Sequence, residues 1–213
     1  MQLNIKQPHN KFKFKCKRCS FCCDNTIIQL YPFDIKNICN ALNIITTEFH
    51  QHSIFKLDKD NILRCILKNR PKCPFNDNSN CKIYSSRPIR CRLFPIGRIF
   101  QNNEIQYVLS DKKCIGFDTG HKQTIKEWLE QEKVTEYDEL TKKWNNFIIK
   151  LKSNKLIKQK PFQVIFKKIF YDFDDKLIKQ YREKLRKENN LKDFMDNLYE
   201  IFDLLLKHLP KNI

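Results

Sequence analysis

Four cysteines lie within eight residues near the start of the chain, in the pattern Cys16-x2-Cys19-x2-Cys22-Cys23. Gaps of two residues let the backbone turn around one centre, with its N–H groups directed at the sulfurs. Bacterial ferredoxins use this spacing to hold iron–sulfur clusters, and structural zinc sites use Cys-x2-Cys pairs. The pattern therefore predicts a thiolate-bound metal that organises the local fold. A Cys22–Cys23 disulfide is the alternative, but bridging adjacent residues is strained.

The sequence also predicts the cellular compartment of the protein. The first residues, Met1 to Lys6, contain no apolar run of signal-peptide length. No stretch approaches the roughly 20 apolar residues of a membrane span. We therefore expect a soluble, cytoplasmic protein, in which thiols stay reduced and ten cysteines require a metal-binding or catalytic explanation. The three glycines are too few to favour a phosphate-binding loop.

Later cysteines supply further ligands. With the first four, they make eight, which fits two four-coordinate centres or one binuclear centre with spare ligands. The predicted metal ligands are Cys16, Cys19, Cys22, Cys23, Cys73, Cys81, Cys91 and Cys114. Cys39 and Cys65 are left out, because one falls on a predicted apolar helix face and the other in a short apolar strand. Buried cysteines of this kind behave as small hydrophobic residues.

The stretch from Cys81 to Pro95 contains three arginines close to Cys91. Pro88 is suited to open a short helical turn that would contain Cys91. A centre held by four thiolates is negative, and its burial is costly unless cations pair with it. Guanidinium groups are cations that can also donate hydrogen bonds to the sulfurs of such a centre. The predicted cofactor-binding residues are therefore Arg87, Arg90 and Arg92. The alternative is that these arginines are simply solvated.

The rest of the chain predicts an α+β, mostly helical fold. We expect a loop-rich cysteine module with short strands over residues 1–118 and an all-helical region over residues 119–213. Asp34 is predicted to cap a helix, and Thr46 or Thr47 to start another. Strands are expected within 61–67 and 99–109. Two helices are expected within 121–153, one helical period runs from Phe162 to Leu185, and another runs from Leu191 to Leu205.

These residues together resemble the CxxCxxCC cysteine-cluster family of zinc- or iron-chelating domains, the YkgJ type. The resemblance rests on Cys16–Cys23, Cys73-Pro74-Phe75, Cys81–Tyr84, Arg87-Pro88, Cys91–Pro95 and Cys114. It covers about half of the chain and implies a cytoplasmic metal- or cluster-binding domain. A distant relation to flagellin lysine N-methylases is also implied. Ser20 departs from the pattern, because the family often has glycine there.

Three functions remain open at this stage. The first is a protein that binds zinc or an iron–sulfur cluster, with the x2–x2 spacing leaning toward a 4Fe–4S cluster, and with a protein partner possible. The second is an iron–sulfur-dependent protein-modifying enzyme similar to flagellin lysine N-methylase. The third is a zinc module that binds nucleic acid, motivated by the net charge of +17. The alternative is that lysine occupies solvated positions throughout the chain without a binding role, which the lack of a compact run of Lys/Arg interleaved with aromatic residues favours.

Overall fold

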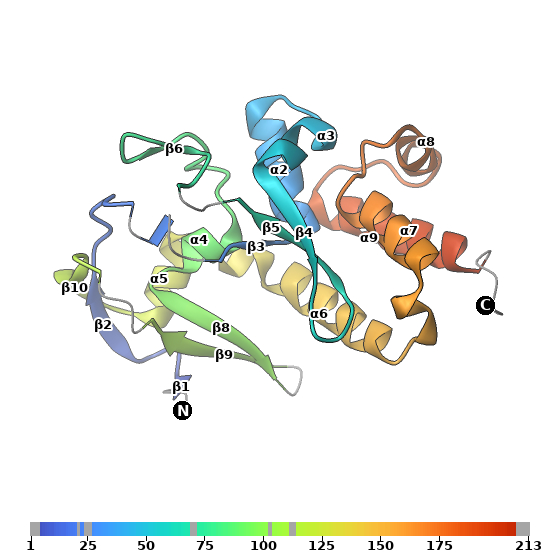
Figure 1. The fold of residues 1–213 in the computed structure, drawn as a ribbon. Helices are drawn as coiled ribbons and strands as arrows, with labels where there is room; N and C mark the ends of the chain where they lie inside the picture. Colours follow the sequence, from blue (N-terminus) through green and yellow to red (C-terminus); the bar gives the residue numbers. More distant parts are fainter. Residues whose placement is uncertain are drawn as a thin grey trace. The chain divides into compact units, whose positions relative to one another are not determined.

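The computed structural model describes residues 5–20, 22–23, 27–68, 72–101, 104–110 and 114–207. The fold is α+β, as predicted, with most strands early in the chain and most helices late (Figure 1). It divides into two compact units that interleave in sequence. Unit 1 comprises residues 1–28 and 68–146, and unit 2 comprises residues 29–67 and 147–213. Cysteine use predicts two domains that meet at residue 118. Because compact units need not fold separately, this division stays a prediction.

Within the described residues, unit 1 contains three small antiparallel sheets and short helices. Its sheets have the strand orders β1-β9-β8, β10-β2 and β6-β7. The strands are β1 (Ile5–Lys6), β2 (Lys11–Phe14), β6 (Asn76–Asp77), β7 (Asn80–Cys81), β8 (Ile96–Gln101), β9 (Glu104–Leu109) and β10 (Phe117–Thr124). The helices are α4 (Ile89–Leu93), α5 (Ile125–Gln131), the 3-10 turn η2 (Thr135–Tyr137) and the first part of α6 (Asp138–Lys152).

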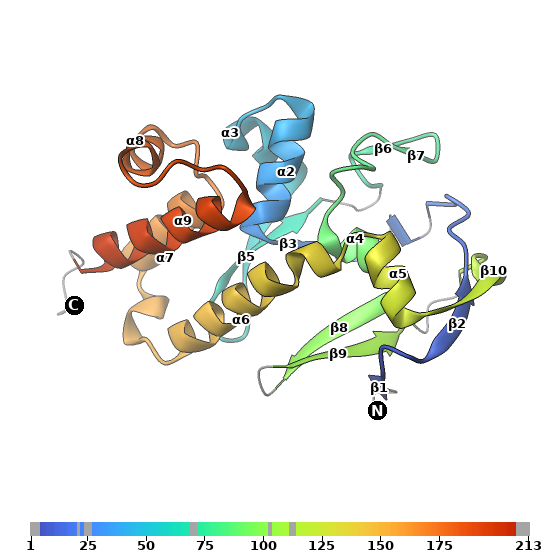
Figure 2. The ribbon, with the colours of Figure 1, turned by 180° about the vertical axis from the view of Figure 1, so that it is seen from behind.

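The core of unit 1 forms where strand β2 meets helix α5. The sequence Lys-Phe-Lys-Phe alternates between exposed and buried side chains, as a strand with one covered face requires. Phe12 and Phe14 both make edge-on ring contacts with Trp128 of α5. Thr124 caps α5, since its side chain accepts a hydrogen bond from the Glu127 N–H while Glu127 accepts from the Thr124 N–H. Strand β10 therefore passes directly into a well-defined helix start (Figure 2).

Unit 2 packs helices against a three-stranded sheet of order β3-β5-β4. The strands are β3 (Gln29–Leu30), β4 (Ser53–Leu57) and β5 (Leu63–Leu67). The helices are α2 (Pro32–Leu42), α3 (Thr46–Phe49), η1 (His50–His52), the end of α6, η3 (Lys155–Lys158), α7 (Lys160–Phe170), α8 (Lys176–Lys184) and α9 (Leu191–Leu206). Helices α7 and α9 lie side by side (Figures 1 and 2), and their buried aromatic rings, including Phe166 and Phe202, form the core.

Three details of the sequence-based prediction are corrected. The helical period from Phe162 to Leu185 is interrupted at residues 171–175, where Asp175 caps a new helix by accepting from the Leu177 N–H. Residues 121–124 extend strand β10 and do not start a helix. Asp34 is the third residue of α2 and not its N-cap, although its carboxylate does accept from the Tyr31 N–H at 3.0 Å. The remaining predicted helices and strands are confirmed within a few residues.

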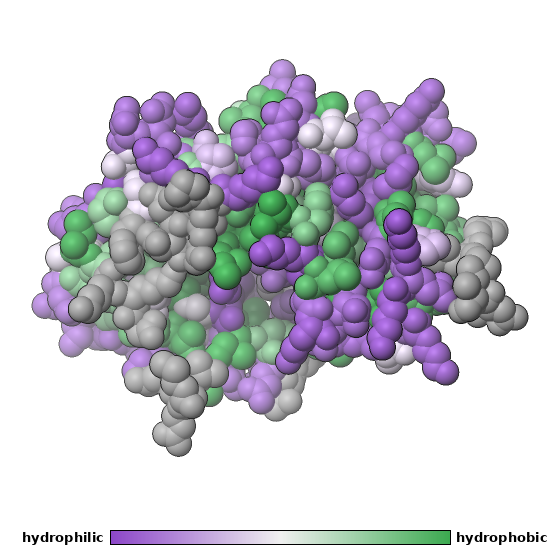
Figure 3. Space-filling model, viewed as in Figure 1, coloured by the Kyte–Doolittle hydropathy of each residue, from purple (hydrophilic) through white to green (hydrophobic). Residues whose placement is uncertain are grey.

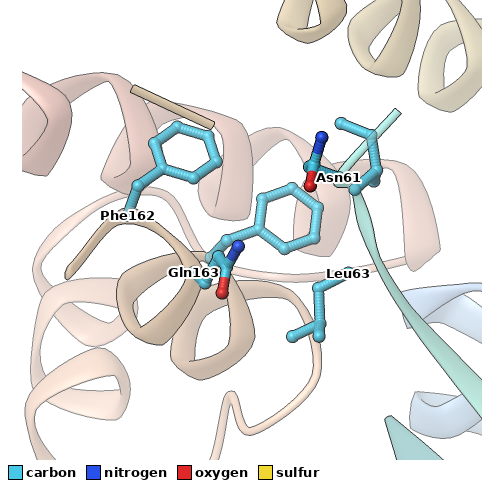
Figure 4. Close-up of a pocket in the computed structure, with 6 residues that line it drawn as sticks. Asn61, Leu63, Phe162 and Gln163 are labelled. Carbon is cyan, nitrogen blue, oxygen red and sulfur yellow. The ribbon is translucent and has the colours of Figure 1, made fainter. Parts of the chain in front are cut away.

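On the visible face, hydrophilic side chains are interspersed with smaller hydrophobic patches (Figure 3). A shallow depression in unit 2 is lined by Asn61, Ile62, Leu63, Phe162, Gln163 and Phe166 (Figure 4), none of which is a metal-binding or nucleophilic residue. Within the described ranges, no helix has the length and apolar character needed to cross a membrane.

Candidate metal centre

The two units divide the ten cysteines by environment. Cys39 and Cys65 belong to unit 2, where both are buried and burial raises the pKa of each thiol to about 12. Such thiols stay protonated and pack as small hydrophobic groups. All eight predicted ligands belong to unit 1, and each is exposed or half-buried with its thiol reduced: Cys16, Cys19, Cys22, Cys23, Cys73, Cys81, Cys91 and Cys114.

A short hairpin carries Cys73 and Cys81. Strands β6 and β7 pair with each other and place Asn76 opposite Cys81. The two residues between the strands, Asn78 and Ser79, both have positive φ. Positive φ at both positions is the geometry of the tight hairpin turn that matches strand twist. The Cys73 carbonyl accepts from the Asn76 N–H at 3.0 Å, which folds Cys73 back toward the hairpin. The two cysteines are thus fixed on one rigid element.

Cys81 and Cys114 each open a turn with the same hydrogen bonds. The N–H three residues later, of Tyr84 or Phe117, donates to the cysteine carbonyl at 3.2 Å or 3.0 Å. The N–H two residues later donates to the sulfur, from Ile83 to Cys81 and from Gly116 to Cys114 at 3.4 Å. An N–H group directed at sulfur stabilises a thiolate over a thiol. Each turn therefore directs one backbone N–H at a cysteine sulfur that could bind metal.

The pKa of Cys81 reflects opposing influences from its neighbours. The pKa of Cys81 is raised overall, because burial outweighs the hydrogen bond from the Ile83 N–H, which lowers it. Negative charge on the Cys23 sulfur raises the pKa of Cys81 further, and the Arg87 guanidinium lowers it. Cys23 and Cys81 are therefore close enough in unit 1 to interact electrostatically, although they lie far apart in the sequence. Repulsion between two such thiolates favours a bound cation.

Gly116 brings the first and last predicted ligand segments together. The Lys15 N–H donates to the Gly116 carbonyl at 3.1 Å, so the chain entering Cys16 runs beside the turn that begins at Cys114. A Cβ atom on Gly116 would lie 2.6 Å from the Lys15 carbonyl oxygen, which no backbone contact tolerates. Only glycine fits this close approach. The sequence-based prediction did not include Gly116 among the site residues. Its position two residues after Cys114 could have indicated a role beside that ligand.

The loop that follows Cys16 uses left-handed backbone. Arg18 has φ of 52° and Ser20 has φ of 62°, a region that strains residues with a Cβ atom. The Arg18 guanidinium lies over the Tyr84 ring, 5.2 Å from its centroid. This contact places the loop against the turn that begins at Cys81. The left-handed conformation of Ser20 explains why the family often has glycine at this position.

Ser20→Gly is expected to stabilise the chain by up to about 1 kcal/mol, because removing the Cβ relieves left-handed strain of about 1–2 kcal/mol against a smaller entropic cost. Ser20→Val should destabilise it by a similar amount. The midpoint of urea unfolding of metal-loaded protein measures both changes. If glycine destabilises and valine does not, then this loop does not keep a left-handed residue at position 20.

The three predicted cofactor-binding arginines have different surroundings. Arg87 pairs with Glu132, donates to the Tyr84 carbonyl at 2.7 Å and stacks on the Tyr84 ring at 3.8 Å. Arg92 is buried and donates to the carbonyls of Arg87, Glu132 and Ser85. Arg90 is exposed. Arg87 and Arg92 thus brace the segment between Cys81 and Cys91, and a direct role for any of the three toward a metal centre stays a prediction.

Trp128 connects two cysteine-bearing segments. Its ring packs on Phe12 and Phe14 of β2, the strand that leads into Cys16. Its Nε1 donates to the Leu93 carbonyl at 3.2 Å, at the end of the helix that contains Cys91. The short helix itself is confirmed: α4 starts directly after Pro88, and the Cys91 N–H donates to the Pro88 carbonyl at 2.9 Å.

The donor set suits zinc or iron–sulfur chemistry, because it consists of accessible thiols with N–H groups directed at two of the sulfurs. Among the residues that the structure describes, no three Cys, His, Asp or Glu side chains converge closely enough to form a complete metal site. Convergence of several thiolates requires a cation to offset their mutual repulsion, and metal binding and folding are coupled in such modules. The eight ligand assignments therefore stay predictions.

Comparison with known proteins gives one match. Residues 15–115 match the model of a family named CxxCxxCC and described as a "putative zinc- or iron-chelating domain". The match begins just before Cys16 and ends just after Cys114, so it spans all eight predicted ligands. No curated protein and no solved structure matches the chain.

Proposed function

We propose that this chain is a cytoplasmic protein that binds zinc or an iron–sulfur cluster through the cysteine thiolates of unit 1, because residues 15–115 match the model of the CxxCxxCC family of zinc- or iron-chelating domains. Bound metal would supply either a structural crosslink, if it is zinc, or an electron-transfer centre, if it is an iron–sulfur cluster.

The observation that carries this proposal is the separation of the cysteines. Eight exposed or half-buried thiols lie in unit 1 within the matched family domain, while the two buried thiols lie in unit 2. The accessibility of the thiols therefore follows the division of the fold. Reduced thiols at this density also fit a reducing compartment such as the cytoplasm.

The contacts within unit 1 suggest which ligands share a centre. The charge of Cys23 acts on Cys81, and Cys73 precedes the hairpin that contains Cys81. These three would form one group. Cys16 follows the Lys15 N–H that bonds to Gly116, so Cys16 and Cys114 would belong together. Two centres, each completed by neighbouring cysteines, use the eight thiols without leaving spare ligands.

Metal removal provides the test. In such modules the free energy of metal binding is part of the free energy of folding. A chelator is therefore expected to release the metal and to increase amide hydrogen exchange at residues 15–23, 73–93 and 114–117. Helices α7 and α9 of unit 2 serve as the internal reference. Full retention of hydrogen-exchange protection in unit 1 after complete metal loss would contradict the proposal.

A further inference from the structure

The two-stranded ribbon of β2 and β10 presents a strongly basic face in unit 1. Phe12 and Phe14 are buried, whereas Lys11 and Lys13 on the other face of β2 are exposed. The chain stays exposed beyond the strand, through Lys15, Lys17 and Arg18. Residues 11–18 include five cations and no carboxylate. The basic ribbon is defined here as Lys11, Lys13, Lys15, Lys17, Arg18, Lys122 and Lys126.

The register of the ribbon places like charges opposite each other. Lys13 pairs directly with Lys122, and both side chains are exposed on the same face. A like-charge pair across an antiparallel ladder is destabilising. Among the described residues, no carboxylate forms an ion pair with Lys11, Lys13 or Lys122. The facing lysines therefore repel each other, and a bound anion would relieve that repulsion.

The nearby carboxylates neutralise only part of this face. Glu127 accepts from the Thr124 N–H and from the Thr124 hydroxyl, and these hydrogen bonds lower its pKa, with a smaller contribution from the charge of Lys11. Glu130 is 4.0 Å from Lys126 at the outer end of the ribbon. Asp118 is the one carboxylate within strand β10, and it lies in the bulge between the two registers of the pairing.

We propose that the basic ribbon binds the phosphate backbone of nucleic acid without reading its sequence. A two-stranded antiparallel ribbon is one of the two elements that fit the major groove. Lysines two residues apart on a strand are about 7 Å apart and follow one direction, as phosphates along a nucleic-acid strand do. This binding function goes beyond metal binding, although Lys15, Lys17 and Arg18 lie next to the predicted ligands Cys16 and Cys19.

The two side chains of the ribbon best shaped for bidentate contacts with bases are both engaged elsewhere. Gln123 is its one amide side chain, and it is buried, with its Nε2 donating to the Phe14 carbonyl at 3.1 Å. Arg18 has the planar fork best suited to a bidentate contact with guanine, but its guanidinium lies over the Tyr84 ring. The remaining exposed cations are lysines, which act on phosphates as point charges. Backbone binding with steep salt dependence follows.

The test uses full-length, metal-loaded protein and the anisotropy of fluorescein-labelled 20-base-pair DNA and RNA duplexes over a range of salt concentrations. The double variant Lys13→Gln/Lys122→Gln is expected to weaken binding about tenfold or more and to reduce the slope of log Kd against log salt by about 2, since each lost phosphate contact reduces it by about 1. Metal content measured on the same samples should not change, which separates this result from the proposed metal site.

Lys176→Gln/Lys179→Gln is the matched control, because it removes the same charge from two exposed lysines of helix α8 in unit 2. This control should retain the wild-type affinity and slope. Equal losses in both double variants would overturn the proposal, as would wild-type protein that binds neither duplex at low salt. Tighter binding to polyglutamate, or to phosphatidylserine vesicles, than to either duplex would also overturn it and would identify a different partner.

Discussion

Cys19→Ser and Cys91→Ser are each expected to lower metal affinity by more than about 100-fold, since loss of a mere outer-shell partner already costs about 10–100-fold. Serine is nearly isosteric with cysteine but does not provide a thiolate. Cys19 is exposed and Cys91 is half-buried in α4. Neither side chain therefore carries enough core packing to explain a large loss of stability by itself. The readouts are metal per chain and the midpoint of thermal unfolding.

Cys39→Ala and Cys65→Ala are the matched controls for this prediction. Both residues are buried in unit 2 with pKa values raised to about 12. Each substitution should cost about 1–2 kcal/mol through lost packing while leaving metal per folded chain unchanged. If the serine variants keep full metal content and thermal stability, the ligand assignment of Cys19 and Cys91 is wrong.

Trp128→Ala is expected to destabilise the protein by about 3–5 kcal/mol, the usual cost of emptying a large aromatic site. The side chain is only 7% exposed and packs on two phenylalanine rings of β2. Because it also binds the Leu93 carbonyl, its loss should loosen both the strand before Cys16 and the helix that contains Cys91. Metal affinity should therefore fall together with stability, which chemical unfolding and metal titration would record.

Trp128→Phe separates packing from hydrogen bonding at this site. Phenylalanine keeps most of the ring contacts but leaves the buried Leu93 carbonyl without the indole N–H. The expected cost is about 1–3 kcal/mol, smaller than for alanine. A phenylalanine variant as unstable as the alanine variant would show that the link to Leu93, and not the aromatic packing, dominates. Unchanged metal affinity in Trp128→Ala would show that Trp128 does not support the cysteine segments.

The helices of this chain were more predictable from sequence than the strands of unit 1. Long apolar periods, such as Leu191 to Leu205, specify a buried helix face by themselves. Strand β10 contains Asp118, Gly120, His121 and Lys122, and it pairs with β2 across a bulge. Its pairing partner lies far earlier in the sequence, so no local pattern could reveal it. The break after Phe170 was missed because apolar residues on both sides keep nearly the same period.

The metal-binding residue types could be predicted from spacing, but their supporting contacts could not. Cysteine spacing selected eight residues that all belong to unit 1. The roles of Gly116 and Trp128 depend on contacts with Lys15 and Leu93, which are distant in sequence. Arg87 and Arg92 illustrate the same limit, since the sequence placed them near Cys91 but could not show their contacts with Glu132 and with backbone carbonyls.

The most direct test of the central claim is the content of zinc, iron and acid-labile sulfide per chain, with the visible spectrum, in protein purified without air. The account predicts bound metal. Brown protein with a band near ~400 nm and iron matched by sulfide would identify an iron–sulfur protein, and colourless protein with one or two zinc ions and no sulfide would identify a zinc protein. Protein that carries neither metal, and takes up neither zinc nor iron with sulfide on reconstitution, would contradict it.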